Sequence, residues 1–104
     1  MKRKISPSEA KSILGRTPDR VSFWLCTNQK LYSLKELAEI LYNVNDEVFR
    51  YHVNKDKNDF ENWIRDIIQD RELAREISRI KTKETLTKKI SDRVVQLNRI
   101  QKKK

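Results

Sequence analysis

Five apolar residues between positions 60 and 68 recur at the spacing of one face of an α-helix. Phe60, Trp63, Ile64, Ile67 and Ile68 stand at i, i+3, i+4, i+7 and i+8. A face this wide and this apolar is stable only when it packs against a hydrophobic core. The sequence therefore predicts that the rest of the chain is organised around a buried helix at these positions.

Polar residues just before the apolar face define where this helix starts. The side chain of Asn58 can accept a hydrogen bond from a free backbone N–H group, and Glu61 stands at the reciprocal position of a capping box. Asp59 lies in the first turn, where its charge suits the positive end of the helix dipole. We therefore predict that the helix begins directly after Asn58.

A shorter helix is expected directly upstream. Phe49 and His52 share one helical face with two valines. Asn45 or Asp46 can open this helix, and the polar run from Asn54 to Lys57 forms the turn that follows it. The two helices should make a hairpin with aromatic residues at its seam. The motif and core residues expected here are Phe49, Tyr51, His52, Asn58, Asp59, Phe60, Trp63, Ile64 and Asp66.

The N-terminal segment carries the signals of a short helix. Ser6 can cap it, Pro7 suits the first helical position, and Glu9 completes a capping box. We expect the helix to end at Gly15 in the left-handed conformation that glycine adopts readily.

Two further helices have recognisable starts. Ser33 and Glu36 form another capping box, before a helix that runs to about Asn43. Asp70 can cap a later helix. Their apolar faces consist of Leu34, Leu37, Ala38, Leu41 and Val44 in the first, and Leu73, Ala74, Ile77 and Ile80 in the second.

Residues 21–32 are the one part of the chain rich in β-branched and aromatic residues. Asn28, Gln29 and Lys30 form a turn after this run. Because a lone hairpin is marginal in water, an extended arm on the helices is as compatible with the pattern as a strand pair. A helical turn from Phe23 is a third interpretation.

The last element is a long basic helix that starts at Thr82 or Thr85. Its apolar seam is narrow, as in a two-helix or self-associating contact, but it can equally fold back on its own chain. The seam is formed by Leu86, Ile90, Val94, Leu97 and Ile100.

With 104 residues, one glycine and two prolines, the chain is expected to form one mostly α domain. We predict a compact small helical domain with a short extended or hairpin segment near residues 21–32 and a long basic C-terminal helix. Its parts are a basic lead and short helix at 1–20, a helical core at 21–81 and a basic amphipathic helix and tail at 82–104.

The net charge of +9 is unevenly distributed. Residues 1–20 carry six basic and two acidic residues, residues 21–80 carry nine and eleven, and residues 81–104 carry nine and two. The central part is therefore close to neutral, with a net charge of −2, and the two ends carry the positive surplus.

The sequence contains few residues that could form a catalytic or metal-binding site. The only histidine, His52, and the only cysteine, Cys26, lie far apart in the sequence, and a metal site needs several convergent ligands. Asp59 and Asp66 are about 10 Å apart along a helix, which is wide for a carboxylate pair sharing one substrate. We expect His52 to lie at a helix–helix seam, and we expect no catalytic residue, metal or cofactor.

The aromatic residues permit two interpretations. Trp24, Trp63, Phe23, Phe49 and Phe60 could form a stacking platform for nucleic-acid bases. Aromatic residues at helical spacing more often belong to a core. The core assignment is favoured for Trp63 and Phe60, and less strongly for Trp24.

Several segments resemble a small, largely archaeal prokaryotic domain family of unknown function. The resemblance covers about residues 22–80 and implies a mostly helical domain with no assigned reaction. It implies a glycine turn where this chain has Asn28 and Gln29, and it leaves the basic ends outside. The segments that carry it are Phe23-x-Leu25, Ser33-Leu34-x-Glu36-Leu37, Val48-Phe49-x-Tyr51-His52-Val53-Asn54, Asn58-Asp59-Phe60-x-Asn62-Trp63-Ile64-x-Asp66 and Leu73-Ala74.

The charge distribution favours a non-enzymatic binding module whose basic ends engage nucleic acid, RNA or the ribosome rather than a specific DNA sequence. Other polyanions are also expected ligands. The alternative is a protein-interaction or regulatory adaptor, with a protein partner or a second copy on the C-terminal helix. The expected phosphate-binding residues are Lys83, Lys88, Lys89, Arg93, Arg99, Lys102, Lys103 and Lys104.

No membrane partner is expected, because no apolar run approaches the roughly 18 residues of a membrane span. The basic N-terminus is followed by no apolar stretch, so no secretory signal is expected. A single cysteine fits a reducing compartment, and we therefore expect a cytoplasmic location.

Overall fold

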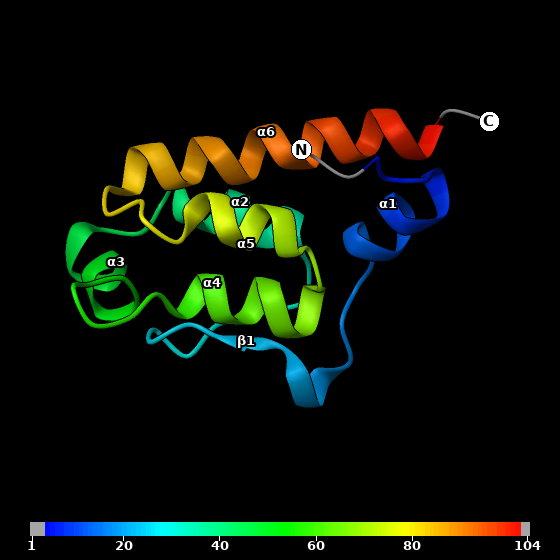
Figure 1. The fold of residues 1–104 in the computed structure, drawn as a ribbon. Helices are drawn as coiled ribbons and strands as arrows, with labels where there is room; N and C mark the ends of the chain where they lie inside the picture. Colours follow the sequence, from blue (N-terminus) through cyan, green and yellow to red (C-terminus); the bar gives the residue numbers. More distant parts are fainter. Residues whose placement is uncertain (1–3, 103–104) are drawn as a thin grey trace.

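A computed structural model describes residues 4–102, and within them the chain is mostly helical, as predicted (Figure 1). One short antiparallel hairpin precedes the central helices, and a long helix ends the described chain. In chain order the elements are α1 (Pro7–Leu14), the 3-10 turn η1 (Asp19–Val21), β1 (Phe23–Trp24), β2 (Lys30–Leu31), α2 (Leu34–Leu41), α3 (Asp46–His52), α4 (Asp59–Trp63), the π-helical segment η2 (Ile64–Ile68), α5 (Arg71–Ile77) and α6 (Lys83–Lys102).

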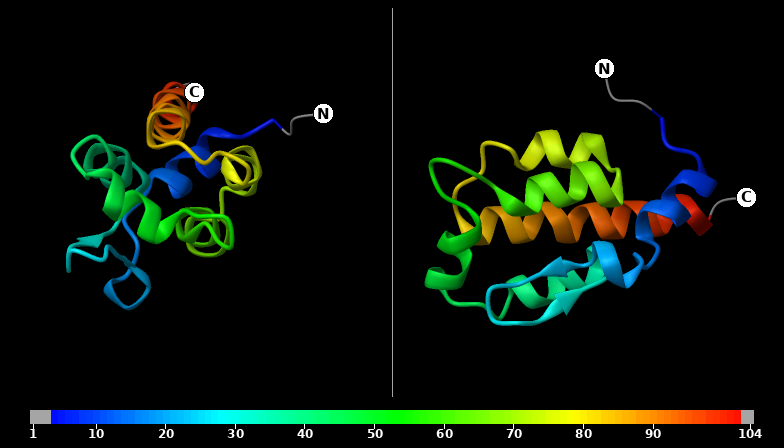
Figure 2. Two further views of the ribbon diagram at one scale, coloured as in Figure 1. Left: turned by 90° about the vertical axis from the view of Figure 1, so that its left-hand side faces the viewer. Right: turned by 90° about the horizontal axis from the view of Figure 1, so that it is seen from below.

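The long helix α6 lies along one side of the molecule, and α1, α2 and α5 pack against it (Figures 1 and 2). Helix α4 packs on α5, and the β1–β2 hairpin covers α4 on the side away from α6. Helix α3 follows the predicted order but lies across one end of α4 rather than alongside it.

The apolar seam of α6 is buried within its own chain. Leu86, Ile90 and Leu97 are fully buried, and Val94 is nearly so. Ile100 is partly buried against the same core. This seam therefore provides one wall of the hydrophobic core, and its burial supplies much of the reason for α6 to be ordered on the domain.

The capping residues mostly act as predicted. Ser6 and Glu9 form both hydrogen bonds of a capping box, and the side chains of Asn45, Asn58 and Asp70 each accept a backbone N–H three residues later. These bonds fix where α1, α3, α4 and α5 begin.

Two of the predicted helix-end details are wrong. Gly15 has φ −69° and ψ 167°, which is extended rather than left-handed backbone. The side chain of Glu36 does not complete the box with Ser33 but accepts the backbone N–H of Tyr32 at 2.6 Å. Glu36 therefore ties α2 to the end of the hairpin.

Residues 21–32 form a true hairpin, in which Phe23 pairs with Leu31 and Trp24 with Lys30. Asn28 has φ 71°, so asparagine occupies the left-handed turn position at which the family resemblance implied glycine. Because successive strand residues point to opposite faces, Phe23 is buried while Trp24 is 59% exposed. The core assignment of Trp24 is therefore wrong.

The central apolar stripe spans α4 and η2 as one continuous helical run. Phe60, Trp63, Ile64 and Ile68 are buried, and Ile67 is partly buried. The widened π turn ends at Gln69, whose φ of 67° is left-handed, and the chain then turns back into α5.

Within residues 4–102, no helix combines the length and the apolar character that crossing a membrane requires.

Replacing Ile90 by alanine should lower the free energy of unfolding by about 2–5 kcal/mol, because the fully buried side chain would leave a cavity between α6 and the core. The matched control is Val95→Ala on the same helix, where the side chain is 48% exposed and the expected change is within about 0.5 kcal/mol. Chemical denaturation measures both. Equal, small changes would contradict the packing of α6.

Candidate functional site

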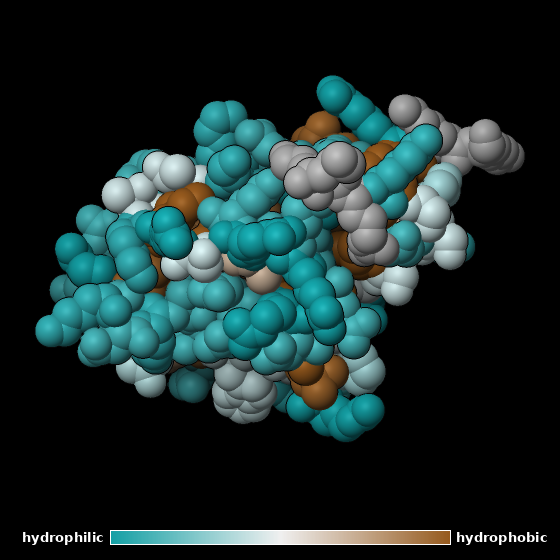
Figure 3. All heavy atoms as spheres, in the orientation of Figure 1, coloured by the Kyte–Doolittle hydropathy of each residue, from teal (hydrophilic) through white to brown (hydrophobic). Residues whose placement is uncertain are grey.

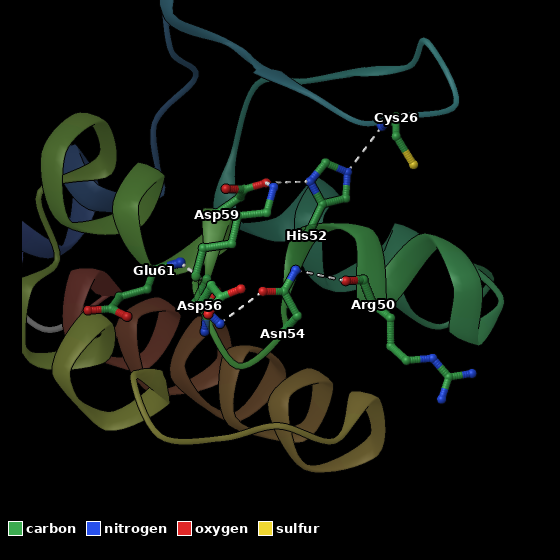
Figure 4. Close-up of polar contacts among 9 residues, drawn as sticks. Cys26, Arg50, His52, Asn54, Asp56, Asp59 and Glu61 are labelled. Atoms are coloured by element: carbon green, nitrogen blue, oxygen red, sulfur yellow. Dashed lines mark hydrogen bonds and ion pairs between the residues drawn. The ribbon is translucent and has the colours of Figure 1, made fainter.

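His52 has a hydrogen-bond partner at each ring nitrogen (Figure 4). Its Nε2 lies 3.1 Å from the backbone nitrogen of Cys26, and its Nδ1 lies 3.0 Å from Oδ2 of Asp59. Because a backbone N–H can only donate, Nε2 must accept, and a neutral ring then carries its proton on Nδ1 and donates it to Asp59. A histidine–carboxylate pair is therefore present, but its outer nitrogen is occupied by the main chain rather than open to a substrate.

Aromatic rings surround His52 and bury it. Its ring centroid lies 5.1 Å from that of Phe23, 5.3 Å from that of Phe60 and 5.0 Å from that of Tyr51. Only 3% of the residue is exposed. His52 thus joins the hairpin, α3 and α4, which agrees with the predicted position at a helix seam.

Asp59 binds a cation as well as the histidine. Its Oδ2 lies 2.9 Å from Nζ of Lys57, and this hydrogen bond raises the pKa of the lysine above its ordinary value. Asp59 is also the first residue of α4, where the helix dipole favours a negative charge. Through Oδ2 the carboxylate therefore joins His52 and Lys57 at the α3–α4 connection.

The asparagines of the motif stabilise the backbone around the same connection. Asn58 caps α4 and donates from Nδ2 to the carbonyl of Ile77 at 3.2 Å, which links α4 to the end of α5. The side-chain oxygen of Asn54 accepts the N–H of Asp56 at 3.0 Å (Figure 4). The backbone carbonyl of Asn54 accepts from Nζ of Lys81 at 3.0 Å. These polar motif residues therefore have a structural role, because their hydrogen bonds stabilise the backbone of the fold.

Two residues expected in the motif core lie at the surface instead. Tyr51 is 60% exposed, with Nζ of Lys57 at 4.8 Å from its ring centroid. Asp66 is exposed and pairs with Arg65 at 3.0 Å, and the hydrogen bonds from that guanidinium lower the pKa of the carboxyl group. Asp66 and Asp59 have different partners and form no acid–base pair.

Arg93 was expected to contact phosphate, but it is buried, with 5% of the residue exposed. Its Nε and Nη2 donate to the two carboxylate oxygens of Asp70 at 2.7 and 2.9 Å, and Nη1 donates to Gln96. Burial acts to lower the pKa of Arg93, but the hydrogen bonds to Asp70 together with the charges of Asp70, Glu72 and Glu76 outweigh it, and the pKa is raised. Arg93 therefore stabilises the α5–α6 contact and is removed from the candidate interface.

The other predicted phosphate contacts divide into two groups. Lys83 donates to the carbonyl of Val44 at 2.7 Å, and Lys88 pairs with Asp92 at 3.0 Å on the exposed surface. Lys103 and Lys104 lie outside the described residues. The residues that are exposed and form no ion pair in the described part of the chain are Lys89, Arg99 and Lys102.

A groove of about 910 Å³, which the sequence did not suggest, lies where η2, α5 and α6 meet the N-terminal segment. It has equal numbers of basic and acidic side chains, so its lining favours neither anions nor cations. The charged residues that line it are Arg65, Arg71, Arg75, Arg93, Glu9, Asp66, Asp70 and Glu72.

Across residues 4–102, the histidine, cysteine and carboxylate side chains nowhere gather in a group of three or more that could hold a metal ion.

A family model described as a family of unknown function (DUF5752) matches residues 18–97. The match is wider than residues 22–80, over which the sequence motifs carried the resemblance. The match includes most of α6, so Lys83, Lys88 and Lys89 lie within the family region. The expectation that the basic ends lie outside it is wrong for these three residues. No curated protein and no solved structure matches the chain.

His52→Ala should lower the free energy of unfolding by at least about 2 kcal/mol, because it leaves a cavity among the rings and deprives the Cys26 N–H group of its acceptor. Tyr51→Ala, one position away and exposed, should change stability by less than about 1 kcal/mol. Thermal and chemical unfolding compare them. An unchanged stability for His52→Ala would rule out the structural role.

Arg93→Met should cost about 3–5 kcal/mol of unfolding free energy, because it leaves the buried carboxylate of Asp70 without its cation. Arg99→Met on the exposed face of α6 removes the same charge and should stay within about 0.5 kcal/mol. Denaturation of the two variants side by side makes the comparison, and similar midpoints would refute a buried pair.

Proposed function

The chain belongs to DUF5752, a family of unknown function, and we propose that it is a small non-enzymatic binding module that engages nucleic acid through its basic ends. RNA or the ribosome is favoured over a specific DNA sequence, and the proposed site of action is the cytoplasm. The proposal rests on how the fold arranges charge.

The observation that carries the proposal is that α1 packs against α6. Residues 1–20 and 81–104, which hold net charges of +4 and +7, are far apart in the sequence. In the fold, α1 and the C-terminal half of α6 lie at the same end of the molecule (Figures 1 and 2). The exposed cations of α1 and of the C-terminal half of α6 therefore lie at one end of the molecule instead of at separate places.

The exposed cations at this end suit phosphate contacts. Arg99 and Lys102 on α6 and Lys11 on α1 are exposed. Neither Arg99 nor Lys102 has a carboxylate partner within residues 4–102. Free lysine and arginine side chains bind phosphate without reading sequence and release counterions from the nucleic acid. Figure 3 shows the mainly hydrophilic surface of the molecule in the orientation of Figure 1.

Two further observations support a binding role over the alternatives. Both ring nitrogens of His52 are already hydrogen-bonded, so the residue most suited to acid–base chemistry is engaged in the fold. The apolar seam of α6 is occupied by its own core, so a protein partner would have to contact the outer face of the helix.

Binding of the full chain to an RNA duplex of about 16 base pairs should weaken steeply with salt. The double variant Arg99→Gln/Lys102→Gln should reduce the slope of log K against log salt by about 2, because each lost cation removes about one phosphate contact. Fluorescence anisotropy over a series of salt concentrations measures the slope.

The matched control is Arg79→Gln/Lys55→Gln, which makes the same change in net charge with two exposed residues. Arg79 lies in the connection before α6, roughly 30 Å from Lys102 by helix rise. This control should change the slope by less than half as much. A flat salt response of the unmodified chain, or equal effects of the two double variants, would refute the proposal.

A further inference from the structure

Two exposed aromatic rings at the hairpin and α3 each have a lysine beside them. Trp24 is 59% exposed and Tyr51 is 60% exposed. Nζ of Lys30 lies 4.9 Å from the ring centroid of Trp24, and Nζ of Lys57 lies 4.8 Å from that of Tyr51. Tyr42 is exposed as well, whereas the three phenylalanines and Trp63 are buried, and what distinguishes Trp24 and Tyr51 is the ammonium group over each ring.

Tyr51 and the residue next to Trp24 both contact the buried His52. Tyr51 precedes His52 on α3, and the two rings meet edge to face at 5.0 Å. Trp24 follows Phe23, whose ring contacts His52 at 5.1 Å, and the N–H group of Cys26, two residues later, donates to His52. His52 therefore holds β1, which carries Trp24, against α3, which carries Tyr51.

The lysines are held in place as well. Nζ of Lys30 lies 3.3 Å from a carboxylate oxygen of Asp19, and Nζ of Lys57 lies 2.9 Å from Asp59. Both ion pairs are partly exposed, where such pairs contribute little stability, so a competing anion can replace the carboxylate at small energetic cost. Each ammonium group is thus kept next to its ring and can still meet a phosphate.

We propose that Trp24 and Tyr51, with Lys30 and Lys57, form a stacking surface for unpaired bases of single-stranded RNA. An aromatic face combined with an adjacent cation matches a nucleotide, which offers a flat base and a phosphate a short distance apart. An apolar partner protein would match the rings alone and not the two lysines. This inference rests on the proposed function and narrows its substrate class.

Single strands are specified because the bases of a duplex are already stacked on each other. Only an unpaired base can place its face against a protein ring, whereas the phosphates of both forms remain available to the basic end. The two surfaces therefore have separate roles. The basic end binds the backbone of either form, and the aromatic pair adds affinity for the unpaired one.

The test measures how tightly the full chain binds an oligouridylate of about 16 nucleotides and an RNA duplex of equal length. Trp24→Ala and Tyr51→Ala should each weaken binding of the single strand by about fivefold or more and leave duplex binding within about twofold. Trp24→Phe and Tyr51→Phe keep a ring and should keep most of the affinity. Tyr42→Ala is the matched control, since Tyr42 is 71% exposed on a different element.

Each possible result either supports or refutes the proposed stacking surface. If the alanine variants bind the single strand as well as the unmodified chain does, the stacking surface is refuted while salt-dependent duplex binding upholds the proposed function. Equal losses for single strand and duplex, or an equal loss in Tyr42→Ala, also refute it. If neither RNA binds at any salt concentration, the proposed function fails and this inference fails with it.

Discussion

The packing of the α6 seam onto α1, α2 and α5 is the contact on which the arrangement of this molecule depends. Burial of Leu86, Ile90 and Leu97 closes the core on one side, and it also sets the position of α1 next to the C-terminal half of α6. Hydrophobic packing thereby determines where the exposed cations of α1 and α6 lie on the surface. The exposed cations Lys11, Arg99 and Lys102 are brought to one end of the molecule because the apolar area removed from water outweighs the screened repulsion between exposed charges.

A second constraint comes from buried polar groups that have no access to water. Arg93 and Asp70 form a buried ion pair between α5 and α6. His52 forms hydrogen bonds with the backbone N–H of Cys26 and the carboxylate of Asp59, between the hairpin and the central helices. Such groups are costly to bury alone, so each pairing specifies which elements must meet. The chain thus uses the residues most suited to chemistry, its one histidine and its best-placed arginine, to fix its fold. The proposed binding surfaces consist instead of exposed cations and aromatic rings.

Local signals predicted most of the elements. The caps at Ser6, Asn58 and Asp70 and the stripe from Phe60 to Ile68 identified helices correctly, because both depend on neighbours within a few residues. The conformation at Gly15 and the partner of Glu36 were missed for the opposite reason. Each depends on where the following segment goes, and helix periodicity carries no information about that direction.

By itself the sequence determined a mostly helical fold, the burial of Trp63 and Ile90, and an excess of positive charge at both ends. Only the tertiary structure decided that α1 packs against α6, that Arg93 is inside while Arg99 is outside, and that Trp24 faces water. The physical reason is that charge and hydrophobicity are properties of single residues, which a sequence displays directly. Whether a cation finds a buried carboxylate or an aromatic ring finds a core depends on the side-by-side placement of distant segments, and only the folded chain creates that placement.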